Sequence, residues 1–139
     1  SLPHAAVLMS PWCDLTNSGD SLLSNDGRDP KLTAQHVNFA AKHYAGKNNL
    51  NDPIISPING EFDDTFPPTL ITSGSRDLLM SQSSGLANIL RRQGVFVDLR
   101  IWKDLWHVFE WDDQLPEAYQ SIIEIGECLT GHMNKAFEC

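Results

Sequence analysis

An aspartate and a histidine are the residues best placed to do chemistry, and each comes just after a stretch that predicts a β-strand. Asp77 follows the run 69–76, and His107 comes thirty positions later, after the run 97–102 and a short turn. A carboxylate beside an imidazole fixes the tautomer of the ring and stabilises its protonated form, so that the imidazole can act as a general base. The pair therefore predicts acid–base catalysis, provided that the two loops meet.

Three runs of residues predict the strands that would carry these loops: 5–9, 69–73 and 95–102. The first run is continuously apolar, which is typical of a parallel strand buried on both faces, and we expect it to lie centrally in a sheet. The third run alternates apolar and polar side chains, which is typical of a strand near the edge.

Three further segments predict helices. Thr33 and Gly46 have the residue types of an N-cap and a C-terminal stop around one helix, and Ser81 to Ser84 can cap a second helix that ends before Gly94. The segment from Pro116 to Met133 carries apolar residues at steps of three or four and predicts a closing helix.

The order of these elements predicts an α/β fold with a mostly parallel sheet and flanking helices, forming one partial domain over residues 1–139. Ligands of such sheets gather beyond the carboxyl ends of the strands, where both loops are expected. Residues 14–66 are polar and mostly irregular, and we expect this excursion to be lid-like, whereas 67–139 carries the acid and the histidine.

The composition of the chain limits the kinds of partner that it can bind. The chain has 139 residues, 41% of them hydrophobic, and a formal charge of −8, which disfavours nucleic acid because phosphates require Lys and Arg. No apolar run is long enough to span a membrane. Cys13, Cys128 and Cys139 are odd in number and widely spaced, so we expect reduced thiols and a cytoplasmic location. The sequence starts at Ser1, and we expect an upstream segment that is absent from it.

Several stretches of the sequence resemble the C-terminal half of an α/β-hydrolase of the hormone-sensitive-lipase-like esterase family. They are Ala5-Ala-Val-Leu-Met-Ser-Pro-Trp-Cys-Asp-Leu-Thr, Asp52-Pro-Ile-Ile-Ser-Pro, Pro67-Pro-Thr-Leu-Ile, Gly74-Ser-Arg-Asp-Leu-Leu and Trp106-His-Val-Phe. The resemblance implies that Asp77 is the acid and His107 the base of a Ser-His-Asp triad, and that the segment from Trp12 to Phe66 forms part of the pocket wall or lid. It also implies that the edge strand from Val95 to Trp102 can form a homodimer.

Two motifs of that family are absent from the sequence: the Gly-x-Ser-x-Gly nucleophile elbow and the His-Gly-Gly oxyanion motif. The nearest similar stretch, Ser81-Gln-Ser-Ser-Gly85, opens a helix after the acid, whereas an elbow must follow a strand. The expectation is therefore a hydrolase of short or medium acyl esters that uses a small-molecule substrate and no cofactor or metal. The serine would lie outside this chain, which should be inactive alone.

Some alternatives stay open. The chain could be a small-molecule binder derived from a hydrolase, an inactive fragment or a dimerisation module. Asp14 could be a rival acid, although it more simply anchors a turn. His36 and His43 lie on one helical face but lack a third metal ligand. Trp12, Val108 and Phe109 are candidates for the substrate pocket.

Overall fold

The computed structural model describes residues 2–137, with side chains as far as His132; Cys139 and the side chain of Met133 lie outside this description. Its elements follow the predicted order. They are β1 (Ala6–Met9), α1 (Ser21–Ser24), α2 (Ala34–Ala45), the 3₁₀ turn η1 (Pro57–Asn59), β2 (Thr69–Gly74), α3 (Met80–Arg92), β3 (Val97–Trp102), the 3₁₀ turn η2 (Phe109–Trp111) and α4 (Pro116–Phe137).

The strands form a parallel sheet in the order β1-β2-β3, so the carboxyl ends of all three strands meet at one edge. β2 is buried along its whole length between its two neighbours. Within the described residues β1 pairs only with β2, and its side chains are half-buried or exposed. The prediction that β1 is central and buried on both faces is therefore wrong for this structure, because no strand or helix covers its outer side here. β3 lies at the opposite edge, as its alternating pattern predicted.

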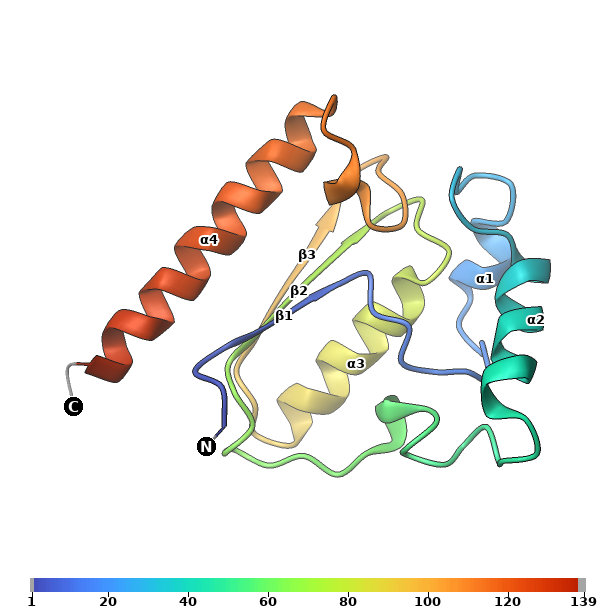
Figure 1. The fold of residues 1–139 in the computed structure, drawn as a ribbon, viewed down its shortest axis with the longest axis horizontal. Helices are drawn as coiled ribbons and strands as arrows, with labels where there is room; N and C mark the ends of the chain where they lie inside the picture. The colour runs from blue at the N-terminus through green and yellow to red at the C-terminus, as the bar shows by residue number, and fades with distance from the viewer. Residues whose placement is uncertain (1, 138–139) are drawn as a thin grey trace.

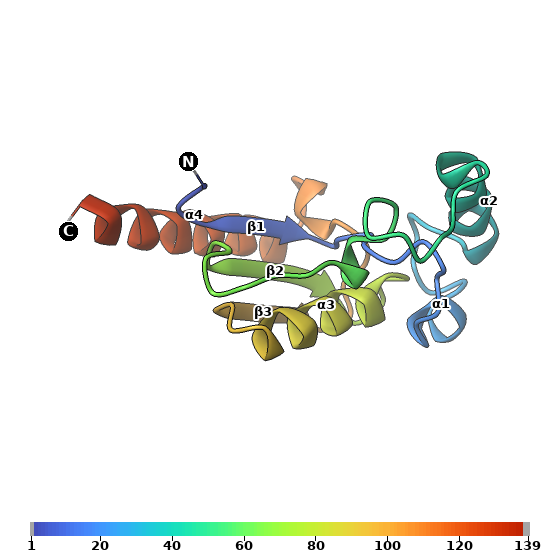
Figure 2. The same ribbon diagram turned by 90° about the horizontal axis from the view of Figure 1, so that it is seen from below.

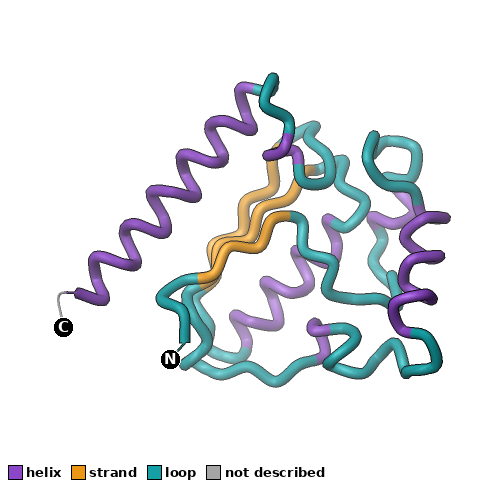
Figure 3. The backbone as a smooth tube through the Cα atoms, in the orientation of Figure 1, coloured by secondary structure: helices purple, strands orange, loops and turns teal. Residues whose placement is uncertain are grey.

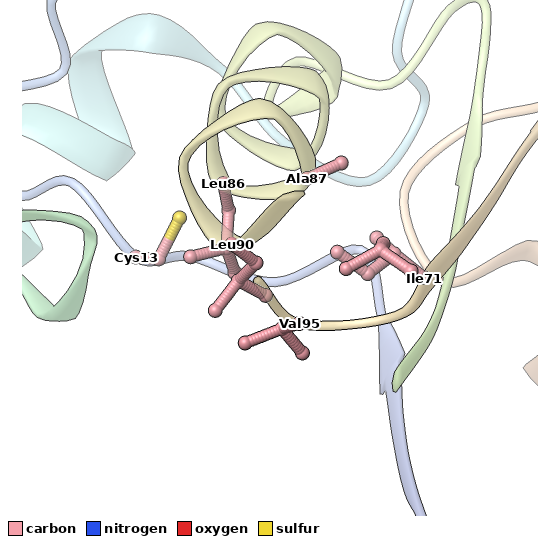
Figure 4. Close-up of a cluster of buried hydrophobic side chains, with 7 residues drawn as sticks. Cys13, Ile71, Leu86, Ala87, Leu90 and Val95 are labelled. Carbon is pink, nitrogen blue, oxygen red and sulfur yellow. The ribbon is translucent and has the colours of Figure 1, made fainter. Parts of the chain in front are cut away.

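Helices α3 and α4 lie on opposite faces of the sheet, as Figure 1 shows. The view in Figure 2 shows β1, β2 and β3 stacked in order, with α3 beside β3. Buried apolar side chains fill the space between α3 and the sheet, and Figure 4 shows this cluster: Cys13, Ile71, Leu86, Ala87, Leu90, Val95 and Val97. Burial of this apolar face is what holds α3 against the strands.

The ends of α2 agree with the capping residues predicted from the sequence, whereas the start of α3 does not. The hydroxyl of Thr33 accepts a hydrogen bond from the His36 amide and caps α2, and Gly46 ends that helix with φ 59°. Helix α3 begins earlier than predicted, at Met80, and its N-cap residue Leu79 makes no side-chain hydrogen bond. The predicted capping by Ser81 to Ser84 is wrong because these serines already lie inside the helix.

The excursion between β1 and β2 is mostly loop, as the teal tube in Figure 3 shows, and α1 and α2 lie at the far end of the molecule from α4. The Gln82 side chain of α3 anchors the start of this excursion. The carboxamide of Gln82 accepts hydrogen bonds from the amides of Cys13 and Asp14 and donates one to the carbonyl of Asp14. None of the helices in residues 2–137 combines the length and the apolar character needed to cross a membrane.

Candidate active site

Asp77 and His107 meet at the carboxyl edge of the sheet. Asp77 lies in the loop 75–79 after β2, which we call the acid loop, and His107 lies in the loop 103–108 after β3, which we call the histidine loop. The His107 Nδ1 atom lies 3.2 Å from the Asp77 Oδ1 atom. The carboxylate is fully buried, whereas the imidazole keeps 21% of its side-chain surface exposed. The ring is therefore held from the inside and can be reached from outside.

Three donors orient the Asp77 carboxylate. The Ser73 hydroxyl donates to Oδ2 over 2.6 Å, and the Leu79 amide donates to Oδ1 over 2.9 Å, next to His107. Burial opposes ionisation of this carboxyl, but the hydrogen bonds from His107, Ser73 and Leu79 outweigh it and lower the pKa of Asp77 below its ordinary value. The group is therefore an anion at neutral pH, as stabilisation of an imidazolium requires.

Close backbone contacts tie the histidine loop to the acid loop. The Arg76 amide donates to the carbonyl of Leu105 over 2.8 Å, and the Asp104 amide donates to the Ser75 hydroxyl over 2.8 Å. A Cβ atom on Gly74 would lie only 2.0 Å from the oxygen of Leu105. The sequence needs glycine at the end of β2 because the histidine loop passes directly over that position.

The end of β1 holds the other side of the histidine loop. The Val108 amide donates to the Ser10 hydroxyl over 3.0 Å, across 98 positions of the chain. Both residues have left-handed backbones, with φ 49° at Ser10 and φ 45° at Val108, which is unusual for side chains of these types. Sequence reasoning missed Ser10, whose only signal is its place directly after a strand.

The excursion also fixes the acid loop. The Asn25 side chain donates to the carbonyls of Ser75 and Asp77, and the Asp29 carboxylate accepts from the Leu78 amide over 2.9 Å. Both Asn25 and Asp29 are buried. Neither residue was predicted from the sequence, because nothing in the local pattern of an irregular segment indicates its distant partners.

Three cavities lie along or near His107. The first has a volume of about 200 Å³, is almost wholly apolar, and lies between His107, Trp12, Leu79 and α2. A second cavity of about 220 Å³ also borders His107. A larger cavity of about 410 Å³ shares Trp12 with the first and extends toward Tyr44.

The predicted pocket residues separate into two groups. Trp12 lines two of the cavities, and Val108 lines the second cavity beside His107. The prediction is wrong for Phe109, whose side chain is 0% exposed. Phe109 packs against Trp102, Leu105 and Ala118, because η2 turns its side chain into the core beneath α4.

The rival candidates have other structural contexts. The Asp14 carboxylate accepts from the amide and hydroxyl of Thr16 and from the Ser18 hydroxyl, the pattern of a turn anchor. The His43 Nδ1 atom contacts the carbonyl of Phe39 on its own helix. Among the described residues no group of three or more His, Cys, Asp or Glu side chains is arranged to hold a metal ion. Ser83, the central serine of the stretch 81–85, is fully buried inside α3.

Comparisons with known proteins agree with this fold. The sequence profile of a family described as having an alpha/beta hydrolase fold matches residues 1–111. The chain is 30% identical over 131 residues to an esterase of Acinetobacter venetianus and 31% identical over 129 residues to an acetyl-hydrolase of Streptomyces hygroscopicus. These matches cover 93% and 92% of this chain but 43% of each relative, so the chain spans less than half of their length.

Solved structures of esterases share this fold. A crystal structure of an esterase from the bacterial hormone-sensitive lipase family superposes with a TM-score of 0.90 at 33% identity, and the match covers 95% of this chain and 44% of that one. A hormone-sensitive-lipase homologue from a metagenome library matches with a TM-score of 0.90 at 32% identity, covering 94% of this chain and 45% of the other.

Proposed function

This chain belongs to the α/β-hydrolase family and is similar to the hormone-sensitive-lipase-like esterases within it, and we propose that it supplies the acid and the base of a serine carboxylesterase. The observation that carries the proposal is the distance of 3.2 Å between His107 Nδ1 and the buried carboxylate of Asp77. A buried anion that faces the inner nitrogen of a partly exposed imidazole is the arrangement that a general base requires.

In the proposed reaction a serine outside these 139 residues attacks the carbonyl carbon of the ester, since the sequence contains no Gly-x-Ser-x-Gly. The outer nitrogen of His107 takes the hydroxyl proton as the new C–O bond forms. It then returns that proton to the departing alcohol, which leaves an acyl-enzyme that water hydrolyses by the same route. Asp77 stabilises the imidazolium in both steps. The chemistry is acid–base and nucleophilic and requires no metal ion.

The apolar cavity of about 200 Å³ between His107 and Trp12 supports a short or medium acyl chain as the substrate part bound there. Its wall consists mainly of aliphatic and aromatic side chains from the acid loop, the β1 end and α2, which favour hydrocarbon over polar groups.

Replacing His107 by Ala tests the proposal in the protein made from the complete coding region. We expect kcat for a p-nitrophenyl butyrate substrate to fall by about 10⁴-fold or more, because the general base is lost. His43→Ala is the matched control, since His43 lies on α2, where its side chain contacts the carbonyl and the ring of Phe39, and it lines none of the cavities beside His107. Undiminished ester cleavage by the His107 variant would refute the assignment.

A fluorophosphonate probe separates an esterase from a binding protein derived from the same fold. We expect the complete protein to be labelled on its serine, and labelling to be slowed strongly by His107→Ala because serine is no longer activated. The 139-residue chain alone should stay unlabelled. Labelling of this chain on Ser83 or any other residue would contradict the proposed division of the triad.

A further inference from the structure

We propose that the second cavity beside His107 binds an anionic group, such as a carboxylate, carried by the alcohol part of the ester. This inference rests on the proposed function, whose site it extends by naming a class of substrate. The cavity has a volume of about 220 Å³ and is lined by Lys31, His107, Val108 and Trp111. It therefore combines a cation and an indole ring with the proposed catalytic base.

The two cavities that border His107 differ in chemistry. The first is lined by Trp12, Leu79 and the inner face of α2 and presents almost no polar surface, which suits an acyl chain. The second is lined by Lys31, whose ammonium is a flexible point charge, and by Trp111, a residue that is 83% exposed. An ester bound at His107 would thus place its hydrocarbon part in the first cavity and a charged, flat group in the second.

Two arginines next to the acid loop add to the positive charge of the segment that carries Lys31. The Arg76 guanidinium donates two hydrogen bonds to the carbonyl of Arg28, and the Arg28 guanidinium donates to the side chain of Asn25, which itself holds the acid loop. In residues 2–137 no carboxylate lies within ion-pair distance of Arg28, Lys31 or Arg76. The chain has only 10 basic residues against 18 acidic ones, so three cations without an ion-pair partner on two linked segments favour an anionic ligand there.

Four acidic residues near the second cavity are held by other partners or line another cavity. Asp77 is engaged with His107, Ser73 and the Leu79 amide. Asp29 is buried and its oxygens accept from backbone amides, including those of Lys31 and Leu78. Asp112 and Asp113 follow Trp111 but line a different cavity, under α4.

Both walls of the cavity are fixed to the site. The Lys31 amide donates to Asp29 over 2.8 Å, and the same carboxylate accepts from the Leu78 amide in the acid loop. On the other wall the Trp111 amide donates to the carbonyl of Val108 over 3.1 Å, and Val108 is held by Ser10. The backbones of Lys31 and Trp111 are therefore anchored to the same loops that hold Asp77 and His107, and their flexible side chains extend from these fixed points.

Binding of stable ester analogues to this chain tests the inference without turnover. The probes are 4-butoxybenzoate, an ether analogue of the butyrate ester of 4-hydroxybenzoate, and its neutral counterpart 4-butoxybenzamide. We expect the benzoate to bind about three- to fivefold more tightly, the range for one partly exposed charge pair, with a shift of the Trp111 indole N–H signal in NMR titrations. The preference should fade near 1 M salt, where the screening length falls to about 3 Å.

Lys31→Met should abolish the difference between the two probes, while Lys31→Arg should retain it. Lys47→Met is the matched control because Lys47 follows α2 and lines none of these cavities, and it should leave the difference unchanged. Equal affinities in the unmodified chain, no binding of either probe, or a preference that survives Lys31→Met would each overturn the inference. A charge preference in this chain together with a complete protein that cleaves no ester would refute the proposed hydrolysis and leave the anion site standing.

Discussion

Gly74 is the residue that lets the two loops of the site touch. It ends β2 at the point where the backbone of Leu105 crosses, and any side chain there would overlap the Leu105 carbonyl. The hydrogen bond between Asp77 and His107 depends on this crossing, since His107 follows Leu105 by two positions. A residue with no side chain thus contributes to the site as directly as the residues that carry the chemistry.

Replacing Gly74 by Ala should destabilise the fold by about 1–3 kcal/mol, the range for overpacking, and should move the histidine loop away from Asp77. Urea unfolding gives the free energy, and loss of the contact appears in the NMR signals of His107. Gly126→Ala is the control, because nothing lies within 4 Å of its added Cβ on α4, and there we expect a gain of up to about 1 kcal/mol. Similar effects of the two substitutions would contradict this account.

The buried carboxylate of Asp77 should make the free energy of unfolding depend on pH in the acidic range. Its pKa is lowered in the folded chain by hydrogen bonds from His107, Ser73 and Leu79, despite burial, relative to about 3.9 in the unfolded chain. Its contribution to stability is therefore present above the unfolded pKa and is lost as pH falls through the folded pKa. In Ser73→Ala the carboxylate loses one donor and its folded-state pKa rises, so the contribution should be smaller and its loss complete at a higher pH than in the unmodified chain. Urea unfolding between pH 7 and pH 3 measures this, and identical pH profiles would count against it.

At the scale of elements, the excursion and α3 act as one support for the site. The carboxamide of Gln82 bridges α3 to the segment after β1, and Asn25 and Asp29 bridge the excursion to the acid loop. These contacts are hydrogen bonds between buried groups, so each element leaves unsatisfied polar groups behind if it separates. The excursion is therefore part of the scaffold of the acid loop as well as a wall of the apolar cavity.

Gln82→Ala should destabilise the chain by about 2–4 kcal/mol, because the buried amides of Cys13 and Asp14 lose their acceptor. Gln120→Ala on the exposed face of α4 is the matched control and should change the free energy of unfolding by less than about 0.5 kcal/mol. Hydrogen exchange should show the Cys13 and Asp14 amides opening faster in the Gln82 variant. Unchanged exchange rates of these two amides would mean that the Gln82 hydrogen bonds contribute little to stability.

At the scale of the whole molecule, both outer edges of the sheet are open in the described residues. β1 and β3 each pair only with β2. On β3, the Arg91 guanidinium donates to the carbonyl of Val97 and so satisfies one backbone acceptor of that strand. An open edge can pair with another strand. We propose, as the family resemblance implies, that the segment from Val95 to Trp102 forms a homodimer by such pairing.

A charge on β3 tests that assembly. Ile101→Lys places an ammonium on the edge strand and should shift the chain from dimer to monomer in size-exclusion chromatography with light scattering. Ile123→Lys on α4 is matched in exposure, at 39% for both isoleucines, and should leave the dimer intact. A chain that is monomeric at all concentrations, or a dimer that survives Ile101→Lys, would rule out this interface.

The amino-acid sequence by itself was enough to predict the parallel α/β order, the strand over 69–73, the helix closed by Thr33 and Gly46, and the loops that carry Asp77 and His107. These features follow from periodicity, capping and turn residues, which act over a few positions of chain. Even there, α3 begins earlier than its serines indicated, since Leu79 and Met80 enter the helix without a side-chain cap.

Only the tertiary structure decided which side chains hold the site. Ser10 supports Val108 across 98 positions, Asn25 supports Asp77 across 52, and Phe109 turns into the core although its neighbour Val108 lines a cavity. It also decided that β1 pairs only with β2 among residues 2–137, which depends on what lies beside the strand and not on its own apolar pattern. The physical reason is that hydrogen bonds and packing between distant segments depend on how the whole chain is arranged, whereas local propensities are set by neighbouring residues.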